Sequence, residues 1–105
     1  MKYPKEVNIL GIPYKIIYLN NSVDVDNKKR ESLWGQIDFW DHVIRIYDNG
    51  RPIEAVWQTI LHEILHGIVE HLKLKNFGGE QGHDKLDLIA LGLTEILFRN
   101  KWIKE

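Results

Sequence analysis

The stretch "TILHEILHGIVEHLKL", Thr59 to Leu74, carries two histidines four residues apart, with a glutamate directly after the first. Residues four apart on an α-helix point the same way, about one turn along the axis. His62 and His66 can therefore present their imidazole rings to one ion at roughly 2.0–2.1 Å each. The pattern predicts a helix at this place in the fold and a metal site on that helix.

Glu63 is expected to play a different part from the two histidines. It falls roughly 100° beyond His62 on the helical wheel, so it cannot easily join the same inner coordination sphere. It can reach a water bound to the metal, take the proton as that water attacks a carbonyl, and pass it to the leaving amine. The alternative is that His62 and His66 are half-buried helix residues satisfied by backbone groups or water.

Helical spacing extends from Ile53 to about Leu72, with Pro52 well placed at the start. The apolar residues on one arc, centred on Leu61, include Trp57, Leu61, Ile64, Leu65, Ile68 and Leu72. "NFGGEQG", Asn76 to Gly82, is expected to end this helix. A second helix is expected from about His83 to Phe98. Its predicted inner face consists of Leu86, Ile89, Ala90, Leu93 and Leu97.

The first half of the chain reads as strands. "VNILGIPYKIIYL", residues 7–19, suits two short strands around a turn, and residues 20–31 form a polar loop with room for one helical turn. "LWGQIDFWDHVIRIYD", residues 33–48, is a second hairpin candidate, with its turn at Asp41-His42 and a return strand from Val43 to Tyr47. The expected class is α+β: a small antiparallel sheet followed by two helices, in one domain over residues 1–105.

Composition excludes several classes of function. The chain has 105 residues, no cysteine and a formal net charge of -1. The net charge argues against nucleic acid as a partner, and the run Lys28-Lys29-Arg30 is flanked by acidic residues. No stretch is long and apolar enough for a membrane span, and "MKYPKEVNIL" has no long apolar core of a secretory signal. A cytoplasmic protein without a membrane partner is expected.

A catalytic zinc ion needs three protein ligands and a water, so a third ligand is sought after the glycine-rich break. With Leu86 at the centre of the second helix's inner face, His83 lies about 60° away on the wheel. Asp87 lies at about 100° and Asp84 at about 160°. His83 is favoured as the ligand, and Asp87, Asp84 and Glu80 stay open, as does a site without a third ligand. Asp87 also suits a partner that orients a histidine ring.

With these residues in place, the chain resembles the minimal zincins, and looks most like small phage- and prophage-associated proteins related to ImmA/IrrE-type and SprT-like metallopeptidases. The resemblance rests on "GIPYKI", "WGQIDFWDHVIRI", "TILHEILHGIVEHLKL" and "HDKLDLIALGLTEILFRN". It implies zinc held by His62 and His66, with Glu63 as general base. It also implies that substrate backbone adds to a strand within residues 33–39 or 43–47. Here His83 stands where many relatives carry a glutamate.

The leading expectation is a zinc-dependent peptidase with Zn²⁺ held by His62, His66 and His83, and with a peptide or protein as substrate. The alternative is a non-catalytic zinc-binding module that binds other proteins. Four tryptophans support the alternative, since exposed ones often anchor partners: Trp34, Trp40, Trp57 and Trp102. The competing interpretation is that Trp57 is core and the other three cover sheet faces.

A second group to stabilise the developing negative charge does not stand out in the sequence. Tyr14, Tyr47 and His71 are candidates that the pattern does not rank. His71 is five residues past His66 and is expected to point away from the site, and His42 falls in the predicted hairpin turn. Both histidines are expected to be ordinary polar residues.

Overall fold

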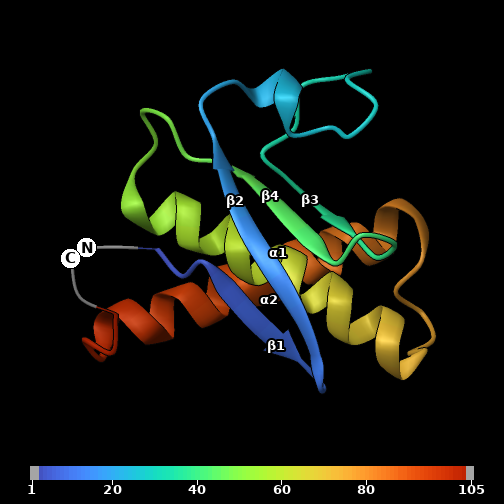
Figure 1. Cartoon of the computed structure of the whole chain (residues 1–105). Helices are drawn as coiled ribbons and strands as arrows, with labels where there is room; N and C mark the ends of the chain where they lie inside the picture. Colours follow the sequence, from blue (N-terminus) through green and yellow to red (C-terminus); the bar gives the residue numbers. More distant parts are fainter. Residues whose placement is uncertain (1–2, 104–105) are drawn as a thin grey trace.

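A four-stranded sheet carries two helices on one of its faces (Figure 1). The computed structural model describes residues 3–103. The strands are β1 (Glu6–Ile9), β2 (Ile12–Leu19), β3 (Gly35–Asp38) and β4 (Val43–Tyr47). The helices are α1 (Ile53–Leu72) and α2 (Gly79–Arg99), and a short 3-10 helix spans Ser22–Asp24. The predicted α+β class is confirmed, and the predicted bounds of α1 and of β4 agree with the structure.

The sheet is mixed, so the prediction of a purely antiparallel sheet was wrong. Its spatial order is β1-β2-β4-β3. The two hairpins, β1 with β2 and β3 with β4, are antiparallel, but β2 and β4 run parallel. The segment after β2 carries the chain across to the far edge before β3 begins, so β4 rather than β3 meets β2 (Figure 1). β3 is therefore an edge strand among the described strands.

The crossing segment, residues 20–34, is organised around Asp26, whose side chain is buried. The carboxylate of Asp26 accepts hydrogen bonds from the backbone N–H groups of Lys28 and Arg30, at 3.0 and 3.2 Å. The bond from Lys28 is the largest of the influences that lower the pKa of Asp26. Lys29 pairs with Asp24 at 2.9 Å. The basic run at this point therefore belongs to a loop, as the sequence indicates.

α1 packs directly on the sheet. The core cluster joins residues of β1, β2 and β4 to two residues of α1: Ile9, Tyr14, Ile16, Ile44, Ile46, Val56 and Ile60. Gly67 lets the helix approach closely, because an added Cβ there would lie 2.8 Å from Cδ1 of Ile9. Because α1 packs against the sheet and against α2, the side chains that project from it are held in place.

The prediction that Leu61 marks the centre of the buried arc of α1 was wrong. Leu61 is only half-buried and Leu72 is exposed. The buried side of the helix is displaced by about one residue from Leu61, toward Ile60. Its buried residues are Val56, Thr59, Ile60, His62, Glu63 and Gly67. The reason is that α1 packs against the sheet on one side and against α2 on another, so the predicted arc lies partly between the two contacts. Glu63 thereby falls on the buried side of the helix.

α2 begins at Gly79, earlier than the predicted start near His83. Gly82 lies within α2, where no side chain fits because the backbone of Phe77 passes beside it. An added Cβ would lie 1.9 Å from the Phe77 carbonyl oxygen. Among the helices and strands, α2 packs chiefly on α1. Leu86 and Ala90 are buried as predicted, but the prediction that Ile89 and Leu93 face inward was wrong, because both are exposed. The helix exposes other apolar side chains as well: Leu88, Leu91 and Ile96. Even so, neither helix within residues 3–103 is long and apolar enough to cross a membrane.

Candidate metal centre

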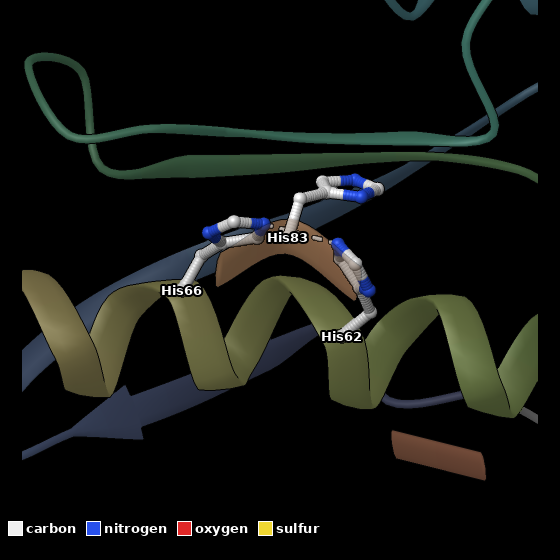
Figure 2. Close-up of side chains that lie close together, drawn as sticks. All are labelled: His62, His66 and His83. Carbon is white, nitrogen blue, oxygen red and sulfur yellow. Dashed lines mark hydrogen bonds between the residues drawn. The ribbon is translucent and has the colours of Figure 1, made fainter. Parts of the chain in front are cut away.

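Three imidazole rings converge between α1, α2 and the edge strand β3 (Figure 2). His62 and His66 project from α1 and His83 from α2, and one nitrogen of each lies within 4.8 Å of the others. Nε2 of His62 and Nε2 of His66 are 3.0 Å apart. Nitrogen ligands of a tetrahedral ion with bonds of about 2.0–2.1 Å lie about 3.3–3.4 Å from one another. Small side-chain rotations would supply that spacing, so the three histidines lie close enough to bind a metal ion.

Each histidine has a different degree of burial. His62 is buried, His66 is half-buried and His83 is exposed. Burial is the main cause that lowers the pKa of His62, and the neighbouring His83 lowers it further. Burial likewise lowers the pKa of His66 to about 4, with help from His62 and His83. These two rings are therefore neutral near pH 7, which is the form that binds metal.

Asp87 faces the far side of the His62 ring. Its Oδ1 lies 3.2 Å from Nδ1 of His62, and that nitrogen is buried. The distance would allow an ion pair only with a protonated ring; beside the neutral ring the carboxylate acts as a nearby negative charge, and the two atoms are not well aligned for a hydrogen bond. A carboxylate in this place favours the tautomer that leaves Nε2 free for an ion. Asp87 thus lies where the sequence suggested a partner that orients an imidazole.

The other acidic candidates for a third ligand lie outside the histidine cluster. Glu80 and Asp84 are both exposed on the first turns of α2. Within residues 3–103, the three histidines are the only group of three or more His, Cys, Asp or Glu residues with atoms close enough to share an ion. His83 joins the pair because α2 starts early, which puts this residue in the second turn, where the helix already lies against α1.

Glu63 lies beneath the edge strand, with 6% of its surface exposed. Burial raises the pKa of its carboxyl to about 8, and a backbone hydrogen bond from Ile37 in β3 opposes that rise. The backbone of Gly35 covers the carboxyl closely, because an added Cβ there would lie 3.0 Å from Oε2 of Glu63. A carboxyl held in this way can accept and release a proton near neutral pH.

A cavity of about 320 Å³ opens beside the cluster. Both helices, β3 and the segment before α1 contribute to its walls, among them Trp34, Gly35, Arg51, Glu63, His83 and Asp87. A second hollow lies along the other histidine of α1, lined by His66 together with Phe39, Val69, Leu74 and Phe77. The histidine cluster therefore borders two recesses, the first through His62 and His83 and the second through His66.

Arg51 is the cavity residue that sequence reasoning missed. Its Nη1 donates to the carbonyl oxygen of Tyr47 at 2.6 Å, and its Nη2 donates to Oγ1 of Thr59 at 2.8 Å and to the carbonyl oxygen of Ala55 at 3.2 Å. The guanidinium carbon lies 4.6 Å from the centre of the Trp34 ring. The only local signal was a position directly before Pro52 and the helix, which says nothing about where the side chain points.

The tyrosine and histidine candidates for charge stabilisation lie elsewhere. The hydroxyl of Tyr14 and Nε2 of His71 share a hydrogen bond of 2.7 Å under the sheet. The ring of His42 lies 5.1 Å from the ring of Tyr14, so it belongs to the same aromatic group. Tyr47 approaches the cavity only through Arg51, with its ring 6.0 Å from the guanidinium. His42 and His71 are thus outside the histidine cluster, as predicted.

Comparison of the chain with models of known protein families, with curated proteins and with solved structures found no match. The resemblance to zincins therefore stays a prediction from the residue pattern. What the chain does has to be inferred from its own side chains.

Proposed function

We propose that the chain is a zinc-dependent peptidase in which His62, His66 and His83 hold the ion and Glu63 is the general base. The observation that carries the proposal is the meeting of three imidazole nitrogens beside a buried carboxyl at the wall of a cavity. Structural zinc sites are closed by four protein ligands, whereas catalytic sites keep one position for water or substrate. A cluster of three ligands favours the catalytic kind.

The donor set fits zinc. Neutral imidazole nitrogens suit this ion, and three histidines form one of the ligand sets of catalytic zinc. Asp87, 3.2 Å from Nδ1 of His62, would keep the ring oriented and raise its basicity. When bound, zinc would lower the pKa of a water toward about 7 and polarise the carbonyl of the peptide bond.

Glu63 would move the proton. Its carboxylate would accept the proton that the attacking water loses as the new C–O bond forms, and would deliver it to the amine nitrogen as the C–N bond breaks. The backbone of Gly35 and the N–H of Ile37 would hold the carboxyl in place during both transfers. β3 is the outer strand of the described sheet and lies beside it, so its edge would pair with the backbone of an extended peptide.

The variant Glu63→Gln tests this proposal. It keeps the shape and the hydrogen bond from Ile37 but removes the base, so zinc content should be unchanged. Hydrolysis of a mixture of quenched fluorescent peptides should fall by about 10²–10⁴-fold. Asp84→Asn is the matched control, because Asp84 is an exposed carboxylate outside the cluster. Equal turnover in Glu63→Gln and wild type would refute the assigned role, and wild-type protein that takes up no zinc would refute the whole proposal.

The second candidate is a non-catalytic zinc-binding module that binds other proteins. Exposed tryptophans favour it: the exposed fractions are 66% for Trp34, 94% for Trp40 and 69% for Trp102. Trp57 packs against the core, but the interpretation that the other three cover sheet faces was wrong. Hydroxamates bind zinc that has an open position, so inhibition of hydrolysis by acetohydroxamate would favour the peptidase. A zinc-loaded protein that neither hydrolyses peptides nor binds acetohydroxamate would favour the module.

A further inference from the structure

Arg51 is a partly buried cation on which Asp48 acts electrostatically without forming an ion pair. Its side chain is about half-buried and lines the cavity beside the histidine cluster, and this burial is the main cause that lowers its pKa. None of the ion pairs among residues 3–103 includes it. A charge taken partly out of water costs free energy unless an opposite charge accompanies it. The cavity thus has a place for an anionic group.

The guanidinium is held in a fixed orientation. Arginine has five N–H donors, and the hydrogen bonds to Tyr47, Ala55 and Thr59 use three of them, so two remain. The ring of Trp34 stacks over the group at 4.6 Å, which fixes its plane. A planar guanidinium that is already oriented binds a carboxylate with little further loss of entropy.

The position of Arg51 indicates how far from the cleaved peptide bond a group bound there would lie. Its Nη2 contacts Thr59, which lies one helical turn before Glu63 on α1. One turn is about 5.4 Å along the axis, and an extended peptide advances about 3.3–3.6 Å per residue. A group bound at Arg51 would therefore lie one or two residues from the reacting carbonyl.

The charge of the cavity also favours an anion once the metal is present. Arg51 contributes one positive formal charge, Asp87 contributes one negative charge, and the buried carboxyl of Glu63 adds at most one more, so the net formal charge is 0 or -1. A divalent ion would make the net charge positive in either case, and a positive cavity attracts an anionic substrate.

From these observations we infer that Arg51 and Trp34 form a subsite that receives a carboxylate of the peptide substrate, one or two residues from the cleaved bond. The inference rests on the proposed peptidase function and names its substrate class. The carboxylate belongs either to an acidic side chain or to the free end of the peptide, and both would meet the guanidinium in the same way. Arg51 would then determine specificity, in addition to linking the end of β4 to α1 through its hydrogen bonds.

The test uses zinc-loaded protein and three dipeptides capped with a hydroxamate, which anchors each compound on the metal. One carries an acidic side chain and an amidated end, one a neutral side chain and a free carboxylate end, and one is neutral at both places. Titration calorimetry gives the affinities. One of the two acidic compounds should bind about tenfold more tightly than the neutral one, and which of them does so identifies the source of the carboxylate.

Two variants of Arg51 and a matched control complete the design. Arg51→Gln should bind all three compounds equally, while Arg51→Lys, which keeps the charge but not the fixed planar orientation, should keep part of the preference. Arg99→Gln removes the same charge from an exposed ion pair with Glu95 and should keep all of it. If Arg51→Gln does not fold, Trp34→Ala replaces it, because Trp34 is exposed and its loss should reduce the preference severalfold.

The outcomes separate the two proposals. If the protein takes up no zinc, or if the zinc-loaded protein does not bind acetohydroxamate, the peptidase proposal fails and the subsite fails with it. If acetohydroxamate binds but the three dipeptides bind wild type equally, only the subsite is wrong. A preference that survives in Arg51→Gln would also overturn the subsite, since the carboxylate would then be recognised elsewhere.

Discussion

Both helices carry histidines of the candidate metal site, but the fold supports the two helices very differently. α1 packs against β1, β3 and β4 on one side and against α2 on another, and it contributes Val56 and Ile60 to the core. α2 packs chiefly on α1. Its buried residues form a single stripe, Gly82, Leu86, Ala90 and Thr94. Two of the three candidate ligands thus lie on α1, which the core holds in place. The third lies on α2, which packs on the rest of the protein chiefly through one stripe of buried residues.

This difference indicates what a metal ion would do besides chemistry. His62 and His66 are held one turn apart by α1 itself, whereas His83 reaches them only while α2 is docked. An ion shared by the three rings would link the two helices. Since such an ion binds the folded arrangement and not the unfolded chain, its binding free energy would add to the stability of the docked helix.

Removing the central contact of α2 should have the largest effect. Leu86 is 1% exposed. Leu86→Ala should lower the free energy of unfolding by about 2–5 kcal/mol, because it leaves a cavity between the helices. It should also weaken zinc binding, since His83 would then lie in a loosened helix. Urea denaturation with and without zinc measures both effects.

Leu88→Ala is the matched control for that experiment. Leu88 lies on the same helix but is 68% exposed, so its truncation should change the free energy of unfolding by less than about 0.5 kcal/mol. Equal losses in the two variants would mean that α2 is not held by its buried stripe, and the contrast between the helices would be wrong.

The next effect concerns His83 alone. Saturation of wild type at 100 times the dissociation constant of zinc should stabilise the fold by about 2.7 kcal/mol, and a chelator should reverse this. Hydrogen exchange should slow in the first turns of α2 when zinc is added. In His83→Ala the pair on α1 can still hold the ion weakly, but the added protection of α2 should disappear.

His42→Asn is the control for loss of a histidine outside the cluster. His42 lies in the β3–β4 turn with a φ of 56°, a conformation that asparagine tolerates, so zinc should protect α2 in this variant as in wild type. Protection of α2 by zinc in His83→Ala would show that the third ligand is not His83.

The sequence was informative about features that depend on neighbouring residues. The 3.6-residue spacing defined α1, the alternation around residues 33–47 indicated the second hairpin, and the four-residue spacing of His62 and His66 placed both rings on one side of a helix. His83 was favoured because it lies near Leu86 on the helical wheel of α2, so the two residues were expected to face the same neighbouring element. In these places local geometry and tertiary structure agree.

The features that local patterns missed depend on contacts between distant residues. No periodicity tells which strand of the second hairpin meets β2, so the parallel pair of β2 with β4 was not expected. The buried side of α1 is turned from Leu61 toward Ile60, because two different elements cover this helix. Arg51 points into the cavity because its hydrogen bonds span the end of β4 and the first turns of α1.

The smallest predicted effect tests the direct polar contact from α2 to the α1 ligand pair. Asp87→Asn keeps the shape of the side chain but removes the charge beside Nδ1 of His62. Because Asp87 would orient the ring without touching the ion, the variant should lose only about tenfold in zinc affinity. Asp84→Asn, an exposed neighbour, should lose nothing. A loss as large as that of His83→Ala would instead identify Asp87 as a ligand, and α2 would then hold the ion through a carboxylate.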